Sequence, residues 1–289
     1  MTPLEYSGPN AQQIQYWNET SGPKWVALHH LVDAQIQPLG LRGMDHARVA
    51  PGERILDVGC GCGSTTVELA RRVGSTGAVT GVDISTVMLE RARQTAIKAG
   101  VSNISFENAD AQTYPFTPAS IDLIYSRFGV MFFAQPEAAF SNLRNALRPG
   151  SRLALVTWQA VQLNPWMFVP VMAASQHITI PLPDSPDAPG PFAFADAERV
   201  RGILSRAGFV DIAFGELNET VTVAGGSDLD QTVQFLLQMG PTGAALREAA
   251  PGTLDAVAAA VRDALKPYVT SDGVRMGAAA WIVTARRPE

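Results

Sequence analysis

One stretch of this sequence constrains the fold more than any other: an apolar segment that runs directly into a glycine-rich turn and then into a helix. Residues 54–58 (Arg-Ile-Leu-Asp-Val) predict a strand, Gly-Cys-Gly-Cys-Gly follows at 59–63, and Ser64 to Val73 predicts a helix. Glycine lets the backbone approach a ligand closely, because no Cβ stands in the way. The free N–H groups and the positive dipole end of a helix suit an anionic group. The stretch therefore predicts a ligand site at the carboxyl end of a strand.

The same alternation of strand and helix continues to residue 158. We expect further strands at 78–83, 103–107, 121–125 and 153–158, with helices at 64–73, from Ser85 to Gly100, and at 137–147. Ser85 is a good N-cap and Gly100 a good C-terminal stop. Strands that alternate with helices predict an α/β fold, in which a parallel sheet is covered on both faces.

The segments outside this core predict additions to a single domain that spans residues 1–289. Apolar residues at helical spacing predict an N-terminal helical cap in residues 1–40, which Gly40 and Gly43 should end. Residues 159–196 are a proline-rich excursion, and we expect two helices in residues 228–266; both segments are predicted to form a lid. Between and after them we expect a helix at 197–207, mostly strand at 210–223, and a last strand at 279–285.

Composition excludes several classes of function. The net charge is −5 and the pI about 5.4, which argues against a nucleic-acid partner. The two cysteines, Cys60 and Cys62, stand too close in a tight turn for a disulfide and lack the second ligand pair of a zinc site, so we expect no metal. No signal peptide opens the chain and no apolar run reaches membrane-spanning length. We expect a soluble, cytoplasmic protein, a monomer or homodimer, with no membrane partner.

Three residues indicate which ligand the glycine turn binds. Asp83 follows Gly59 by 24 residues, the spacing at which a carboxylate accepts hydrogen bonds from ribose hydroxyls. A dinucleotide fingerprint needs a sixth-position glycine, and this chain has Ser64 there. Asp57 would repel a pyrophosphate but attract an ammonium group. A ligand with a carboxylate, an ammonium group and an adenosine fits, and S-adenosylmethionine is such a ligand.

Five motifs in register resemble those of class I S-adenosylmethionine-dependent methyltransferases. They are Asp57–Gly63, Val82–Leu89, Ala109–Ala111, Leu123–Met131 and Leu147–Ser151. Their order and spacing are similar to the small-molecule branch that includes the ubiquinone/menaquinone-biosynthesis methyltransferases, although Cys62 replaces the usual Thr. The resemblance covers residues 50–160, with a cofactor-binding core at 50–158. It implies a Rossmann-like, mostly parallel sheet of seven strands with helices on both faces and a helical lid.

The resemblance also implies a cofactor-binding role for particular residues. Asp57 would lie near the methionine amino group, and Asp83 would hold the ribose hydroxyls. Asp110 and the Ala111 N–H would bind the adenine, which Ile84 and Met88 would flank. For Asp83 a plain helix cap, and for Ile84 and Met88 plain core packing, remain the alternatives. The expected cofactor residues are Trp25, Asp57, Gly59, Cys60, Gly61, Gly63, Thr65, Asp83, Ile84, Met88, Asp110, Ala111, Ser126 and Arg127.

A sulfonium methyl is already activated, so the enzyme mainly aligns the acceptor and excludes water. A general base is needed only if the acceptor starts protonated; His29 is the candidate. Strand 121–125 leads into Ser-Arg-Phe rather than the run typical of nucleic-acid amino-methylating enzymes, which disfavours DNA or RNA and favours a small organic acceptor. Residues such as Phe128, Phe132 and Trp158 favour an acceptor that is apolar or aromatic. A nucleotide-dependent oxidoreductase and a non-catalytic cofactor-binding protein remain the alternatives. The expected acceptor residues are Tyr16, Trp17, Phe128, Met131, Trp158 and Trp166.

Overall fold

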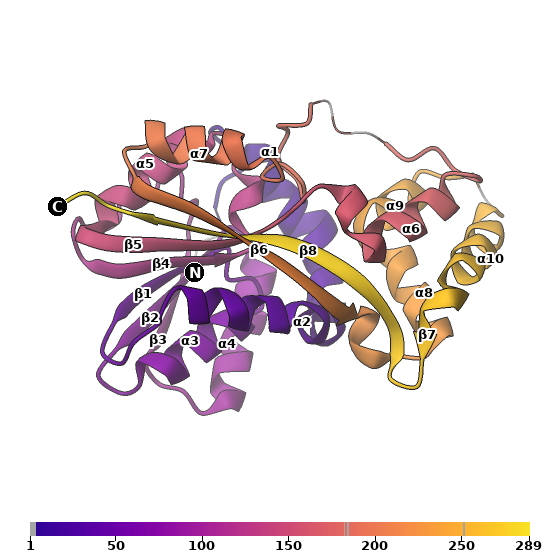
Figure 1. Cartoon of the computed structure of the whole chain (residues 1–289), viewed down its shortest axis with the longest axis horizontal. Coiled ribbons are helices and arrows are strands. Elements are labelled where there is room, and N and C mark those ends of the chain that lie inside the picture. Colours follow the sequence, from indigo (N-terminus) through magenta and orange to yellow (C-terminus); the bar gives the residue numbers. More distant parts are fainter. Residues whose placement is uncertain (1–3, 182, 184, 251) are drawn as a thin grey trace.

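The computed structural model describes residues 4–181, 183, 185–250 and 252–289. These residues form one eight-stranded sheet with the strand order β3-β2-β1-β4-β5-β8-β6, and the short β7 pairs with β8 outside this row. Helices α2, α3 and α4 lie on one side of the sheet and α5 and α7 on the other (Figure 1). The strands are β1 (Arg54–Val58), β2 (Ala78–Asp83), β3 (Ile104–Asn108), β4 (Ile121–Arg127), β5 (Leu147–Trp158), β6 (Val210–Thr222), β7 (Val269–Thr270) and β8 (Gly273–Arg286).

Ten α-helices are described around this sheet. They are α1 (Ala11–Gln15), α2 (Ser21–His46), α3 (Ser64–Val73), α4 (Thr86–Ala99), α5 (Pro136–Ala146), α6 (Pro165–Ala174), α7 (Ala197–Arg206), α8 (Leu229–Gln238), α9 (Gly240–Leu246) and α10 (Thr253–Leu265). A π-helical turn at 16–20 joins α1 to α2. Helices α6, α8, α9 and α10 pack against one another at one end of the molecule (Figure 1). None of the described helices is long and apolar enough to cross a membrane.

The sheet follows from the burial of its strands on both faces. Strands β1 to β5 pair in parallel, and their central residues, such as Leu56 and Ile124, are fully buried. Parallel strands covered by helices on both faces read as continuous apolar runs, which is the pattern of this core. Strand β8 runs antiparallel between β5 and β6. The α/β class and the mostly parallel row of seven strands are confirmed, and β7 is an addition.

The expected end of the first long helix at Gly40 and Gly43 is wrong, because α2 continues through both to His46. A Cβ on Gly40 would lie 2.8 Å from Cδ of Arg127, and one on Gly43 would lie 2.4 Å from a methyl of Val156. These glycines therefore allow the helix to pack closely on the sheet rather than ending it.

Three other expectations were incomplete. Residues 228–266 contain three helices instead of two, because Met239 is extended and Gly240 has a φ of +63°, which separates α8 from α9. The excursion at 159–196 contains α6, and the last strand begins at Gly273 rather than at 279. The expected caps are confirmed: Ser85 accepts from the Met88 N–H, and Gly100 adopts the left-handed conformation.

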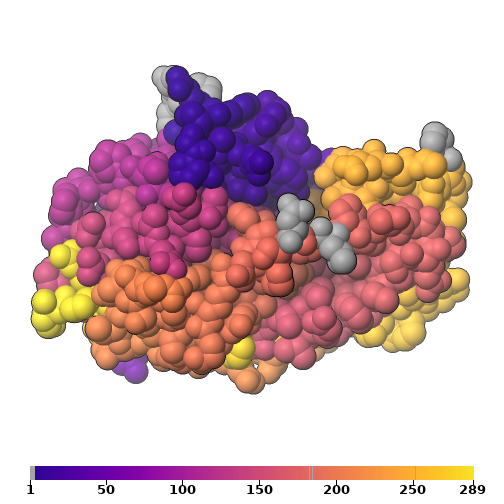
Figure 2. All heavy atoms as spheres, turned by 90° about the horizontal axis from the view of Figure 1, so that it is seen from above, coloured from indigo at the N-terminus to yellow at the C-terminus, as the bar shows by residue number. Residues whose placement is uncertain are grey.

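Space-filling atoms show how the additions gather around the core. The N-terminal residues and the helices of residues 240–266 occupy neighbouring places on one face, with the 165–195 excursion beside them (Figure 2). Contacts join α6 to α9 and α10, and α8 to α9. Segments far apart in the chain therefore meet beyond the end of the sheet where β1 and β4 finish.

Candidate cofactor and acceptor site

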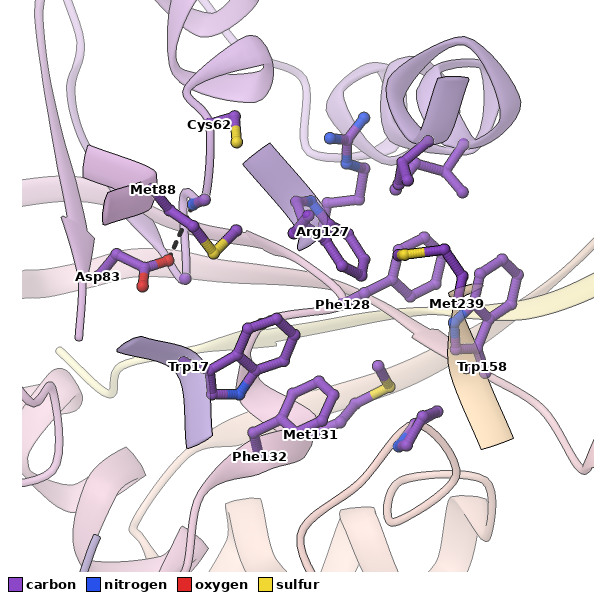
Figure 3. Close-up of a pocket in the computed structure, with 18 of the residues that line it drawn as sticks. Trp17, Cys62, Asp83, Met88, Arg127, Phe128, Met131, Phe132, Trp158 and Met239 are labelled. Atoms are coloured by element: carbon purple, nitrogen blue, oxygen red, sulfur yellow. Dashed lines mark hydrogen bonds between the residues drawn. The ribbon is translucent and has the colours of Figure 1, made fainter. Parts of the chain in front are cut away.

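A deep cavity opens where β1, β2, β4 and β5 end (Figure 3). In the row of strands, β2 lies on one side of β1 and β4 on the other, so the strand order reverses at β1. In open α/β sheets such a reversal leaves a crevice between the two diverging loops, and ligands bind there. The cavity is lined by the glycine turn on one side and on the other by aromatic side chains from the N-terminal segment, the loop after β4, β5, α6 and α8.

The backbone of the glycine turn adopts a left-handed conformation that favours glycine over other residues. Gly59, Gly61 and Gly63 all have positive φ values, of +69°, +56° and +84°. Asp83 at the end of β2 holds this turn, since its carboxylate accepts the Gly61 N–H at 2.8 Å and the Ser85 N–H at 2.9 Å (Figure 3). Burial raises the pKa of Asp83, while these backbone hydrogen bonds lower it. Asp83 is both a cap of the following turn and a partly exposed carboxylate in the cavity.

Asp57 lies behind the glycine turn and is fully buried. Its Oδ2 accepts a hydrogen bond from the Thr66 hydroxyl at 2.7 Å, and its Oδ1 has no partner in the described structure. Burial raises the pKa of Asp57 to about 6, against the lowering effect of hydrogen bonds from Thr66 and Thr65. The Asp57 carboxylate therefore supports the turn from below and does not line the cavity itself.

Ser64, which replaces the third fingerprint glycine, belongs to a polar cluster. Its hydroxyl donates to Oδ1 of Asp33 at 2.7 Å, and Arg127 donates to both partners, at 2.8 Å to Asp33 and 3.0 Å to Ser64. Asp33 comes from α2, Ser64 from the start of α3 and Arg127 from the end of β4. The cluster ties the N-terminal cap to the cofactor turn, and Arg127 and Asp33 both line the cavity.

The end of the cavity near β3 carries a second set of hydrogen bonds. Asp110 accepts from the Gln112 N–H at 3.0 Å, from the Gln112 side chain at 3.1 Å and from Asn10 at 3.4 Å. Met88 lies close to the turn, since a Cβ on Gly61 would be 3.0 Å from its Cε. Ile84, Met88 and Ala111 line this end, which gives it an apolar slot beside a carboxylate.

Aromatic rings line the opposite half of the cavity. Phe128 and Trp158 stack at 3.9 Å with an interplanar angle of 11°, and Trp166 leans on Trp158 at 5.2 Å. Trp17 meets Phe132 edge-on at 5.0 Å. In Figure 3 the rings of Phe128 and Trp158 lie across the cavity from Asp83 and Met88. A flat apolar molecule fits such walls.

Most residues singled out from the sequence meet in this cavity. Of the expected cofactor residues, those that line it are Trp25, Gly59, Cys60, Gly61, Thr65, Asp83, Ile84, Met88, Asp110, Ala111 and Arg127. Of the expected acceptor residues, those that line it are Trp17, Phe128, Met131, Trp158 and Trp166. The roles proposed for them stay predictions, because no ligand contact tests them.

Five of the chosen residues do not line the cavity. Asp57, Gly63 and Ser126 lie one layer behind it; the Ser126 hydroxyl donates to the Val58 carbonyl at 2.7 Å. Tyr16 is 37% exposed and packs edge-on against Trp17 at 5.6 Å without lining the cavity itself. The Nδ1 of His29 lies 2.8 Å from the Val26 carbonyl, so the ring turns back along its own helix.

Several cavity residues gave no recognisable signal in the sequence. Asp33 and Gln35 are polar residues in a helix that was predicted from its apolar residues alone. The residues of α8 and α9 lie far from the cofactor motifs in the sequence. The cavity residues that sequence reasoning missed include Asn10, Asp33, Gln35, Met167, Met239 and Thr242. In the described part of the chain, no group of three or more His, Cys, Asp or Glu residues is arranged to hold a metal ion.

Comparisons with known proteins agree with this geometry. A family described as a methyltransferase domain matches residues 55–150. Aklanonic acid methyltransferase DauC of Streptomyces sp. (strain C5) is 38% identical over 120 residues, 42% of this chain and 54% of that protein. O-methyltransferase cnsE of Penicillium expansum is 30% identical over 209 residues, 72% of this chain and 68% of that protein. The alignments thus span about half of the first relative and two thirds of the second.

A solved structure shares the fold. Phosphoethanolamine N-methyltransferase 2 of Haemonchus contortus, in complex with phosphomonomethylethanolamine and S-adenosylhomocysteine, aligns with a TM-score of 0.50 at 22% identity. The alignment covers 83% of this chain and 50% of that one. The relative cnsE is matched at 30% identity over two thirds of its length, and the glycine turn and Asp83 face one cavity. These findings show that the chain belongs to the S-adenosylmethionine-dependent methyltransferases.

Proposed function

We propose that this protein transfers the methyl group of S-adenosylmethionine to an oxygen atom of a small, apolar or aromatic organic acceptor. The observation that carries the proposal is the division of one cavity into two halves, one built from the glycine turn and Asp83, the other from aromatic rings. Methyl transfer requires two molecules side by side, and this cavity offers each of them a different surface. Two of the relatives are named O-methyltransferases, one from Pyrenophora dematioidea and cnsE from Penicillium expansum, and these names favour oxygen as the accepting atom.

The residues of the first half fit the cofactor. The glycine turn leaves a cradle that a Cβ would fill, since a Cβ on Gly61 would meet the Met88 side chain at 3.0 Å. Asp83 would accept from the ribose hydroxyls, and Asp110, which lines the same half of the cavity, would accept from the adenine amino group. Arg127 would face the methionine carboxylate, while the Asp57 carboxylate below the turn would favour its ammonium group. When bound, the cofactor supplies a methyl group already activated by a sulfonium.

The residues of the second half would hold and shield the acceptor. Phe128 and Trp158 would provide a flat wall for it, and Trp17 would present a ring face that attracts the sulfonium. Catalysis then comes from alignment of the acceptor atom with the methyl group and from exclusion of water. The structure does not place His29 in the cavity, so this proposal gives it no step.

We further propose that residues 1–40, 159–196 and 228–266 form a lid within a single domain. Trp17, Trp166 and Phe235 come from these three segments and all line the cavity. A lid of this kind must open to admit substrate and close to exclude water. We also propose that the protein acts as a monomer or homodimer in the cytoplasm, without a nucleic-acid or membrane partner; the acidic net charge supports the absence of a polyanionic partner.

Calorimetry and a transfer assay test the proposal together. We expect the protein to bind S-adenosylhomocysteine and not NAD. Ser64 stands where a dinucleotide site needs glycine, and the Asp57 carboxylate would repel a pyrophosphate. Isotopically labelled cofactor should then transfer its methyl group to members of a panel of aromatic acids, phenols, amines and thiols. Tighter binding of NAD would support an oxidoreductase instead. Cofactor binding without transfer to any acceptor would support a non-catalytic binding protein.

A further inference from the structure

The charged groups of the cavity are confined to its cofactor half. Among the described lining residues, the titratable or charged side chains are Asp33, Cys60, Cys62, Asp83, Asp110 and Arg127. Burial raises the pKa of both thiols, so they stay protonated. Asp33 already accepts hydrogen bonds from Arg127 and Ser64. The described residues of the acceptor half therefore contribute no side chain that would take a proton from the acceptor.

Among the described residues of the aromatic and aliphatic walls, Gln35 is a polar side chain with a free donor. Gln35 of α2 is 2% exposed and lines the cavity. Its Oε1 accepts the Ala224 N–H at 3.1 Å, which fixes the orientation of the amide. The Nε2 group is then the end left for a ligand, since no acceptor for it lies within hydrogen-bond distance among the described residues. The amide borders the cavity, so an acceptor atom on a ligand there would bind this NH2 group.

We propose that the acceptor enters this cavity already ionised, as the conjugate base of an acidic O–H group on a flat apolar scaffold, and that the Gln35 NH2 donates to that anion. The inference rests on the proposed methyl transfer. A carboxylic acid is the simplest member of this class. The anionic oxygen forms the new O–CH3 bond as the S–CH3 bond breaks, and the electron pair of that bond stays on sulfur. The products are a neutral ester or ether and neutral S-adenosylhomocysteine, and no proton is left for the protein to remove.

The apolar walls favour this reaction over its rivals. Attack by an anion on a sulfonium removes both charges, and opposite charges attract more strongly in a low-dielectric cavity than in water. Attack by an amine would instead leave a new cation among Trp158, Trp166 and Met239, where the described residues offer no carboxylate. An alcohol would need a base that these walls do not provide.

A binding experiment tests the charge of the acceptor without turnover. A naphthoate is titrated by calorimetry into the protein saturated with sinefungin, a cofactor analogue with a positive charge at the methyl position, or with neutral S-adenosylhomocysteine. We expect the naphthoate to bind about tenfold more tightly beside sinefungin, because the two charges attract in the cavity. The uncharged naphthamide should show no such preference. Equal naphthoate affinity in both complexes would overturn the proposal, whereas a protein that binds neither cofactor analogue would overturn the proposed function.

Substitution of Gln35 tests the donor. Gln35→Glu keeps an oxygen for the Ala224 N–H but replaces the NH2 group with a negative charge, whereas Gln35→Met removes both. We expect Gln35→Glu to weaken naphthoate binding by about tenfold or more and naphthamide binding by less than about twofold. Unchanged affinity for S-adenosylhomocysteine verifies that the variant is folded. Equal losses for naphthoate and naphthamide would overturn the role of Gln35, and faster methylation of naphthalenemethanol than of naphthoate by the native protein would overturn the ionised acceptor.

Discussion

The backbones of Gly59 and Gly129 touch each other at the floor of the cavity. A Cβ built on Gly59 would lie 2.6 Å from the Cα of Gly129, and one built on Gly129 would lie 2.7 Å from the Cα of Gly59. Gly59 follows β1 and Gly129 follows β4, the two strands between which the cavity opens. The contact brings the cofactor turn against the loop that carries Phe128, so the two halves of the site are held together by glycine backbones.

Gly129→Ala should therefore damage both stability and cofactor binding. Gly129 has an ordinary φ of −80°, so the added methyl group acts through crowding and not through backbone strain. We expect a loss of about 1–3 kcal/mol in the free energy of unfolding, the usual effect of overpacking. Urea denaturation and calorimetry with S-adenosylhomocysteine measure the two effects. Gly215→Ala is the matched control, because its Cβ would meet nothing closer than 3.9 Å. Equal stability of the two variants would contradict the predicted crowding.

Asp83→Ala should weaken cofactor binding. The carboxylate holds the Gly61 and Ser85 N–H groups and is predicted to accept from the ribose hydroxyls. Loss of a hydrogen bond to a charged group should cost about 1.5–3 kcal/mol, which corresponds to a tenfold or greater rise in Kd. A deoxyribose analogue of S-adenosylhomocysteine separates the two roles. If Asp83→Ala weakens the deoxy and natural ligands equally, Asp83 only caps the turn.

Asp57 should make the protein less stable as the pH rises from about 4 to about 6. Its pKa is raised from 3.8 to about 6 by burial, so in this window the folded state binds more protons than the unfolded state. Stability therefore falls with rising pH, by up to about 3 kcal/mol in total from this group. Asp57→Asn should remove that slope and leave the one that arises from Asp83, whose pKa is also raised by burial. Thermal denaturation of both proteins between pH 4 and pH 7 checks this, and parallel pH profiles would contradict it.

Trp17 and Tyr16 are neighbours with different environments, which makes them a matched pair. Trp17 lines the cavity and contacts Trp25 at 5.7 Å and Phe132 at 5.0 Å, whereas Tyr16 is 37% exposed. Trp17→Ala should lower kcat/KM by about tenfold or more, because it opens the shield around the methyl group. Tyr16→Ala should lower it less than about threefold. Steady-state assays with labelled cofactor decide this, and a stronger effect of Tyr16→Ala would show that the N-terminal turn lies differently in the working enzyme.

The core of the fold could be predicted from the sequence because its signals are local. The apolar run of residues 54–58, the glycine turn and the caps at Ser85 and Gly100 each depend on neighbours within a few residues. Such patterns fix where strands and helices alternate, and alternation implies a parallel sheet. Gly40 and Gly43 were misread for the same reason. A glycine that ends a helix and a glycine that admits a close neighbour look alike until the neighbouring Arg127 and Val156 are placed.

The position of the cofactor half could also be predicted from the sequence, since its residues follow consecutive strands of one sheet. Strand ends of a parallel sheet meet at a single edge, so the turn at 59–63, Asp83 and Asp110 had to approach one another. The acceptor half could not be read in this way. Gln35, Phe235 and Met239 come from α2, from α8 and from the junction between α8 and α9, and only their packing decides that they face the same cavity.

The sequence by itself determined the class of fold, the position of the cofactor turn and the chemistry of the ligand's adenosine and methionine ends. These depend on backbone conformation and on spacing along one strand–turn–helix unit, which act over short distances in the chain. Only the tertiary structure decided which aromatic rings enclose the acceptor, that His29 turns back along its own helix, and that Gln35 offers a free donor. Those outcomes depend on contacts between residues as far apart in the sequence as Gln35 and Ala224, and patterns of neighbouring residues do not predict such contacts.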